Sequence, residues 1–328
     1  MADKLRWGIL GTGWIASQFA RGLAATPGAE LVAVGSRTQE AADKFAEAFN
    51  IPNRHASYKA LAQAANVDAI YISTPHPFHA ENSMLCLENG KAVLAEKPFT
   101  INTQEADAVI GLARQKQVFL MEAMWTRYLP AIVRLRELVA SGVIGEVRMV
   151  TADFGFRTEF KPQGRLFDPA LGGGALLDVG IYPISLAFML LGAPDSISST
   201  AHLGDTGVDE QSGYLFGYAG GQMALLSSAT RTNTPQEACV IGTEGSIKIA
   251  SPWWNASELI LTRSGKAAEV IAPPREGNGY NYEALEVARC LGAGKLESDV
   301  MTLDETRTIM ATLDTIRAQW GLVYPMDN

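Results

Sequence analysis

Two short groups of residues in this sequence have the types and spacing that proton transfer to a bound substrate requires. The first is Glu96-Lys97-Pro98, and the second places Asp178 and Tyr182 four residues apart, hence on one face of a helix. A free tyrosine titrates near pH 10, about three units above neutrality, so it needs a cationic neighbour to act as a base. A lysine at a strand end could touch a substrate hydroxyl and, being cationic, lower the pKa of a neighbouring acid, although a Glu-Lys pair by itself is more commonly a surface salt bridge. Lys97, Tyr182 and Asp178 are therefore candidate catalytic residues.

A third group, residues 11–16, is glycine-rich and follows the apolar run at residues 5–10 directly. Its G-x-G-x-x-A pattern predicts a turn from a strand into a helix whose N-terminus faces the pyrophosphate of a dinucleotide. An ordinary strand-to-helix turn has the same local appearance, but the series of β-α units that follows favours a nucleotide site. The predicted cofactor contacts in this turn are Gly11, Thr12, Gly13, Trp14 and Ile15.

The end of the second predicted strand, near residue 34, indicates which dinucleotide binds. An NAD site has an Asp or Glu there, whereas this chain has Ser36 and Arg37. A hydroxyl and a guanidinium can bind a 2′-phosphate, and no carboxylate repels it. We therefore expect NADP, with NAD possible if Arg37 is only a solvated loop residue.

Further cofactor contacts are expected where later strands end, since ligands bind at the carboxyl edge of a parallel sheet. His79 is predicted either to contact the cofactor or to pack in the helix that follows. The remaining predicted cofactor contacts are Ser73, Thr74, Pro75, His76, Glu96, Lys97, Trp125 and Arg165. No metal is expected, because His76 and His79 lack a third ligand.

The predicted substrate pocket has an aromatic wall with polar groups, which suits a sugar ring or a cyclic diol. Arg148 and Phe154 share one face of a predicted strand, and Asp178 either orients Lys97 or a substrate hydroxyl or caps its helix. Core packing is the alternative for each aromatic residue, and the role of Trp253 and Trp254 stays open. The predicted substrate contacts are Trp125, Arg148, Phe154, Arg157, Asp178 and Tyr182.

The elements that must position these residues change character near residue 123. Up to that point, apolar runs at 5–10, 30–34, 68–73, 92–95 and 118–121 alternate with helical patterns, which predicts a doubly wound parallel sheet. Beyond it come a long strand at 147–156, a helix at 174–191, six strands between 196 and 262 with short links, and two helices at 281–292 and 303–319. We predict an α/β protein with a Rossmann domain at 1–122 and an α+β domain with a large, mostly antiparallel open sheet at 123–328.

Composition excludes several function classes. The formal net charge is -8 over 328 residues, and scattered Lys and Arg argue against a nucleic-acid partner. No apolar run reaches the roughly 18 residues that span a bilayer, and the N-terminus lacks a cleavable signal pattern, so we expect no membrane and a cytoplasmic location. The three cysteines are far apart and are predicted to be buried thiols rather than a disulfide or zinc framework.

Together, residues 11–16, Glu96-Lys97-Pro98 and the segment from Asp178 to Tyr182 resemble the glucose-fructose oxidoreductase, inositol dehydrogenase and rhizopine-catabolism (Gfo/Idh/MocA) family. The resemblance spans nearly the whole chain. Many members have His where this chain has Tyr182, and a tyrosine there resembles the branch of dimeric dihydrodiol dehydrogenases and NADP-dependent D-xylose dehydrogenases. The family implies a homodimer or homotetramer formed through the C-terminal sheet.

The resemblance implies hydride transfer between the nicotinamide and a substrate carbon, with Tyr182 exchanging the hydroxyl proton and Lys97 lowering the pKa of that tyrosine. We expect an NADP-dependent oxidoreductase acting on the CH-OH or C=O group of a sugar, such as D-xylose or glucose. A trans-dihydrodiol dehydrogenase is the enzymatic alternative. A non-catalytic NADP-binding sensor is the alternative from another class, and the presence of both Lys97 and Tyr182 argues against it.

Overall fold

The computed structural model describes residues 4–327 and divides into two compact units. The first comprises Met1–Trp125 and Glu276–Arg307, and the second comprises Thr126–Arg275 and Thr308–Asn328. The helix near residue 285, which we assigned to the C-terminal domain, is thus part of the first unit. Its side chains pack on α1, as described below, and the sequence pattern of one helix does not say which sheet it covers.

The first unit is built on a six-stranded parallel sheet in the order β3-β2-β1-β4-β5-β6. Its central strands are mostly apolar because both faces of a parallel sheet are covered. The short β3 and the helix α3 were not predicted. The strands are β1 (Leu5–Leu10), β2 (Ala29–Gly35), β3 (Asn53–His55), β4 (Ala69–Ile72), β5 (Ala92–Glu96) and β6 (Leu120–Ala123).

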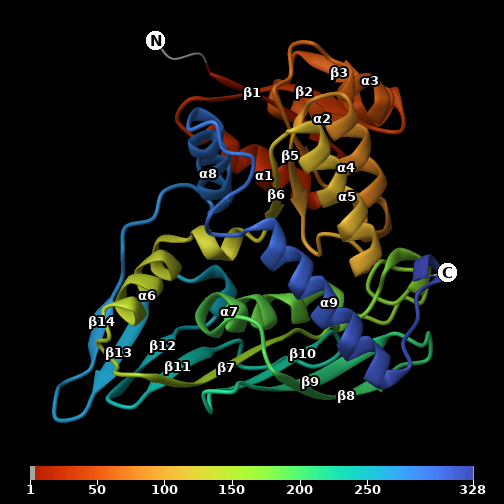
Figure 1. The fold of residues 1–328 in the computed structure, drawn as a ribbon. Helices are drawn as coiled ribbons and strands as arrows, with labels where there is room; N and C mark the ends of the chain where they lie inside the picture. Colours follow the sequence, from red (N-terminus) through yellow and green to blue (C-terminus); the bar gives the residue numbers. More distant parts are fainter. Residues whose placement is uncertain (1–3, 328) are drawn as a thin grey trace. The chain divides into compact units, whose positions relative to one another are not determined.

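Helices cover this sheet on both faces, which confirms the predicted doubly wound arrangement. In Figure 1, α1 and α8 lie on one side of the sheet and α4 and α5 on the other, and each of these pairs is in contact. Side-chain caps begin three of the helices, with Thr38, Ser57 and Asn102 accepting backbone N–H bonds. The helices are α1 (Trp14–Ala24), α2 (Gln39–Phe49), α3 (Tyr58–Ala62), α4 (His79–Glu88), α5 (Thr103–Lys116) and α8 (Tyr280–Gly292).

The second unit is built on an eight-stranded sheet in the order β14-β13-β12-β11-β7-β10-β9-β8. Only β7 and β10 pair in parallel among these strands, which confirms the mostly antiparallel sheet. The edge strand β14 was not predicted. The strands are β7 (Val147–Gly155), β8 (Ser196–Leu203), β9 (Asp209–Gly217), β10 (Met223–Ala229), β11 (Ala238–Gly242), β12 (Gly245–Ile249), β13 (Leu259–Arg263) and β14 (Glu269–Ile271).

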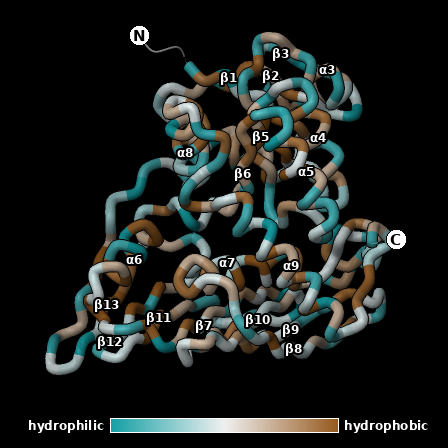
Figure 2. The backbone as a smooth tube through the Cα atoms, in the orientation of Figure 1, coloured by the Kyte–Doolittle hydropathy of each residue, from teal (hydrophilic) through white to brown (hydrophobic). Residues whose placement is uncertain are grey.

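One face of this sheet is covered by helix and the other is open. The helix α7 (Ile181–Leu191) packs on β7 and β10 and is mostly hydrophobic in colour in Figure 2. The stretch Pro169–Leu191 is long and apolar enough to cross a membrane, but 83% of its most apolar window is buried, as in the core helix of a globular fold. The other helices are α6 (Pro130–Ala140) and α9 (Leu303–Trp320), which begins in the first unit and continues in the second.

Candidate active site

The glycine turn of the first unit lies between β1 and α1, as predicted from the sequence. Gly11 has φ +105°, and a Cβ there would lie 2.8 Å from Ser73 Oγ, so the turn requires glycine for both conformation and space. A Cβ on Gly13 would meet nothing within 4 Å, so the position opens onto free space beside the start of α1. That helix start has no side-chain cap and no acidic residue in its first turn. Its N–H groups are therefore suited to hold an anionic pyrophosphate.

The predicted 2′-phosphate contacts follow β2 and lie beside the glycine turn. Ser36 is buried, and its hydroxyl lies 3.5 Å from Thr12 Oγ1. Arg37 is exposed and acts electrostatically on Tyr58, which places its guanidinium near α3. The residues present therefore fit NADP: an open glycine position, an uncapped helix start, a hydroxyl and an exposed cation.

His79 joins the loops that follow β4 and β5. Its ring nitrogens lie 2.8 Å from the carbonyl oxygens of Thr74 and Pro98, and the side chain is 1% exposed. Burial lowers the pKa of His79, and the Lys97 ammonium acts in the same direction. The ring lies between these two loops at the carboxyl edge of the sheet, beside Lys97, and in its neutral form it donates a hydrogen bond to only one of the two carbonyl oxygens. Whether it also contacts the cofactor stays a prediction.

Glu96, the neighbour of Lys97, belongs to a buried acidic network that the sequence did not reveal. The Tyr71 hydroxyl donates a hydrogen bond to Glu96. Glu283, on α8, is fully buried, and neither of its carboxyl oxygens has a hydrogen-bond partner among residues 4–327. Burial, together with the charge of Glu96, raises the pKa of Glu283 well above its usual range. The pair therefore holds a proton next to the strand end that carries Lys97.

In the second unit, Asp178 lies in a π-helical turn, Leu176–Gly180, that leads directly into α7 and Tyr182. Such turns occur frequently at functional sites. Arg165 donates to Asp178 over 2.8 Å, and the Asp178 carboxylate, with Tyr182 acting in the same direction, raises the pKa of Arg165. The structure thus gathers Arg165, Asp178 and Tyr182 into one charged and polar group. The pairing of Arg165 with Asp178 could not be read from the sequence, because nothing in their spacing indicates it.

An aromatic wall stands beside Tyr182. The ring of Phe154 lies 5.3 Å from that of Tyr182 and stacks on Trp254 at 4.8 Å with an interplanar angle of 2°. Gln236, which has a φ of 55°, holds Trp254 by accepting its indole N–H at 3.1 Å. Trp253 instead points its indole N–H to the Asp153 carbonyl and is fully buried. The tryptophan doublet therefore divides into one core residue and one residue of the wall.

The structure gives three further predicted substrate contacts partners of their own. Arg148, at the opposite end of β7 from Phe154 and about 20 Å along the strand at about 3.3 Å per residue, pairs with Glu146. Arg157 is exposed and donates its backbone N–H to Asn233. Trp125 belongs to the first unit, where it is buried and stacks on Tyr280 at 4.6 Å. Sharing a strand face, as Arg148 and Phe154 do, does not bring two side chains together when the strand is long.

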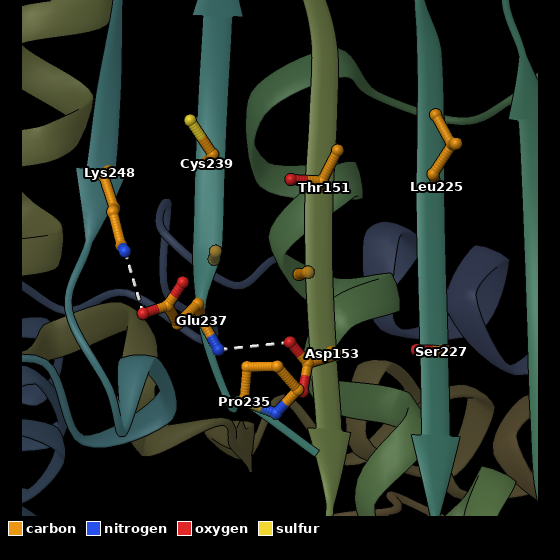
Figure 3. A pocket seen from close by; sticks show the side chains of 10 residues that line it. Thr151, Asp153, Leu225, Ser227, Pro235, Glu237, Cys239 and Lys248 are labelled. Atoms are coloured by element: carbon orange, nitrogen blue, oxygen red, sulfur yellow. Dashed lines mark hydrogen bonds and ion pairs between the residues drawn. The ribbon is translucent and has the colours of Figure 1, made fainter. Parts of the chain in front are cut away.

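The open face of the second sheet carries a shallow groove (Figure 3). In this view Leu225, Thr151, Cys239 and Lys248 form a row across β10, β7, β11 and β12, with Lys248 paired to Glu237 at 2.8 Å. Cys239 is only half-buried, so the prediction of three buried thiols was wrong at this position. Its side chain lies on the face of the sheet that carries this groove, and a strand pattern does not say which face of a sheet is covered.

Comparison with known proteins places both units in one family. A model of an oxidoreductase family with an NAD-binding Rossmann fold matches residues 5–124, and a model of the GFO/IDH/MocA C-terminal domain matches residues 132–248. The chain is 39% identical to the trans-1,2-dihydrobenzene-1,2-diol dehydrogenase of Mus musculus, over 99% of both chains. The corresponding human enzyme is 37% identical over the same share of each chain. The chain belongs to the Gfo/Idh/MocA oxidoreductase family.

Two solved structures are similar over nearly the whole chain. A 3-ketoreductase from Actinomadura kijaniata, in complex with NADP and TDP-benzene, superimposes with a TM-score of 0.86 at 27% identity, covering 96% of this chain and 98% of the other. An aldose-aldose oxidoreductase from Caulobacter crescentus, at 23% identity and a TM-score of 0.87 over 98% and 99% of the two chains, shows the shared fold. As a Gfo/Idh/MocA protein, the chain is an NAD(P)-dependent oxidoreductase, as predicted.

Proposed function

We propose that this Gfo/Idh/MocA enzyme transfers a hydride between NADP and a ring carbon that bears a hydroxyl group, with trans-dihydrodiols as its substrates. The observation that carries this proposal is the flat wall of Phe154 and Trp254 beside Tyr182. A stacked pair of aromatic rings can cover one face of a planar, largely apolar ring while polar groups reach the hydroxyl edge. The similar enzymes of mouse and human carry the name of such a dehydrogenase.

Sugars are the second candidate substrate. A pyranose also presents one apolar face and a hydroxyl edge, so the same wall suits an aldose such as D-xylose or glucose. The similar Actinomadura enzyme is described as a 3-ketoreductase. The acidic group of Asp178, paired with Arg165, supplies further hydrogen-bonding capacity that a polyhydroxylated ring would use.

In the proposed mechanism, the chemistry that NADP supplies when bound is hydride acceptance from the substrate carbon. Tyr182 Oη takes the proton of the substrate hydroxyl during oxidation and returns it during reduction. The Lys97 ammonium stabilises the tyrosinate form, and the neutral His79 ring beside Lys97 adds no second positive charge. Asp178, held by Arg165, orients the substrate hydroxyl.

We further propose that NADP is preferred over NAD. The support is local: no carboxylate directly follows β2, Ser36 offers a hydroxyl beside Thr12, and Arg37 is exposed at the position where a 2′-phosphate needs a cation. The remaining predicted cofactor contacts, from Gly11 to Arg165, stay part of this proposal.

A homodimer formed through the open face of the second sheet is also proposed, with a homotetramer as the alternative. Leu215, Met223 and Leu225 are 40–46% exposed there, and register places Leu225 directly opposite Leu215. Apolar patches of this kind mark contact surfaces. A Leu225→Glu variant that sediments as the wild type does would contradict the proposal.

The free thiols of all three cysteines suit the proposed cytoplasmic location.

A substrate panel tests the proposed function. Absorbance of NADPH is followed with trans-dihydrodiols, aldoses, ketoses and inositols, and with NAD in parallel. The proposal expects the highest kcat/KM for a trans-dihydrodiol with NADP. Faster turnover of an aldose would favour the second candidate, and cofactor binding without turnover of any compound would favour the sensor.

A further inference from the structure

The turn that carries Asp178 begins on a buried acid of a neighbouring strand. Asp209 is the first residue of β9 and has no exposed surface. Its Oδ2 accepts the backbone N–H of Leu176 at 2.7 Å and the Ser212 hydroxyl at 3.1 Å. Leu176 is the first residue of the π turn, and the first N–H groups of any helix lack partners within it. Asp209 therefore caps the turn from outside.

The glycine run before the turn fits closely around this acid. Gly174 has φ +117°, and a Cβ there would lie 2.2 Å from Asp209 Oδ1, so glycine is needed both for the backbone and for the space. The preceding residue is held too, because the Tyr324 hydroxyl donates to the Gly173 carbonyl at 2.5 Å. The chain thus enters the π turn through two successive fixed points.

The same polar cluster supports the far end of the turn. Tyr214 Oη lies 2.6 Å from Ser212 Oγ and 2.7 Å from Ser228 Oγ. A Cβ on Gly180, the last residue of the turn, would lie 2.6 Å from Tyr214 Oη. Asp209, Ser212, Tyr214 and Ser228 therefore form one support cluster beneath the whole turn, from Leu176 to Gly180.

This arrangement is costly for the fold, which argues for a role in the site. Burial raises the pKa of Asp209 to about 7, although hydrogen bonds from Leu176 and Ser212 oppose the change. The titratable groups that face it are Tyr214 on β9 and Tyr324 in the C-terminal segment, and burial raises the pKa of both, so they stay uncharged. A buried acid without a cation beside it weakens a fold, and an apolar residue would fill the space more favourably.

We propose that Asp209 is a positioning residue of the active site: it fixes the π turn and thereby the orientation of Asp178 and Tyr182. It touches neither substrate nor cofactor. The inference rests on the proposed function, in which Tyr182 exchanges the substrate proton. Small displacements of a catalytic group lower rate far more than they lower binding, so the effect belongs in kcat.

Two substitutions at Asp209 separate the hydrogen bond from the charge. Asp209→Ala removes the acceptor, and we expect kcat with a trans-dihydrodiol and NADP to fall about tenfold or more with cofactor affinity unchanged. Asp209→Asn keeps an acceptor oxygen and is expected to stay within about threefold of the wild type. Val240→Ala, a buried truncation on β11 of the same sheet, is the control for lost stability and should leave kcat unchanged.

A double-mutant cycle with Tyr182→Phe decides whether Asp209 acts through Tyr182. When Tyr182→Phe is already present, Asp209→Ala should change the residual rate less than about twofold. An equal loss of kcat with and without Tyr182→Phe would overturn the inference, and so would a wild-type kcat for Asp209→Ala alone. Neither result bears on the proposed function, provided that Tyr182→Phe by itself loses activity. Full activity of Tyr182→Phe would overturn both.

A milder variant carries the same test if Asp209→Ala fails to fold. Tyr214→Phe removes one hydroxyl of the support cluster, and we expect kcat to fall about threefold, again only when Tyr182 is present. An unchanged kcat for a folded Tyr214→Phe enzyme would then overturn the inference.

Discussion

The buried acid Asp209 makes a quantitative prediction about stability and pH. Its pKa is raised from 3.8 to about 7 in the folded protein, a difference of about 3 units. At about 1.4 kcal/mol per unit, this amounts to about 4 kcal/mol between the protonated and ionised forms. Between the two pKa values the folded state binds more protons than the unfolded state, so stability falls as pH rises. The stability that protonated Asp209 contributes is complete below about pH 4, decreases as pH rises toward 7, and no longer changes above about pH 7.

The assay compares wild type with Asp209→Asn, which cannot ionise at this position. Urea unfolding is followed by near-ultraviolet circular dichroism from pH 4 to pH 8. Over this pH range, the free energy of unfolding of the wild type should fall by about 4 kcal/mol relative to that of the variant. Glu283, whose pKa burial also raises, is present in both proteins and cancels in the difference. If the free energy of unfolding depended on pH in the same way for both proteins, Asp209 would not have the raised pKa.

Three further predictions concern cofactor and substrate. Gly11→Ala should abolish NADPH binding, measured by fluorescence, because its φ is +105° and the new Cβ would lie 2.8 Å from Ser73 Oγ; wild-type affinity would contradict the described turn. Arg37→Ala should raise KM for NADP about tenfold and leave KM for NAD unchanged, since only NADP has a 2′-phosphate; equal changes for both would argue against that contact. Trp254→Ala should raise the substrate KM about tenfold with cofactor affinity intact, because the stacked wall is lost, whereas an unchanged KM would place the substrate elsewhere.

Much of the fold was predictable because local patterns decide it. Apolar runs, caps and the G-x-G-x-x-A turn each act over a few residues, so five of the six strands of the first sheet and the helices α1, α2, α4 and α5 were predicted from periodicity. The short β3 and β14 were missed, since three residues carry too little pattern. The position of α8 beside α1 depends on packing between residues some 260 positions apart, which one sequence does not show.

The candidate site also contains residues that local patterns indicate and residues that only the tertiary fold brings together. Motifs indicated Gly11, Lys97, Asp178 and Tyr182, because such residues stand at fixed distances from a strand end or a helix start. Their supports were not predictable: Asp209 follows a turn, resembles any surface acid in the sequence and is buried only by the tertiary fold. Arg165 was predicted as a cofactor contact, but its pairing with Asp178, across a loop, was not.

The central claim is that Lys97 and Tyr182 together perform the proton transfer. The direct measurement is the turnover of a trans-dihydrodiol with NADP by Lys97→Met and Tyr182→Phe, alongside NADPH binding. We predict that both variants bind NADPH as the wild type does and lose about a hundredfold to ten-thousandfold in kcat. Full turnover by either variant would contradict the assignment.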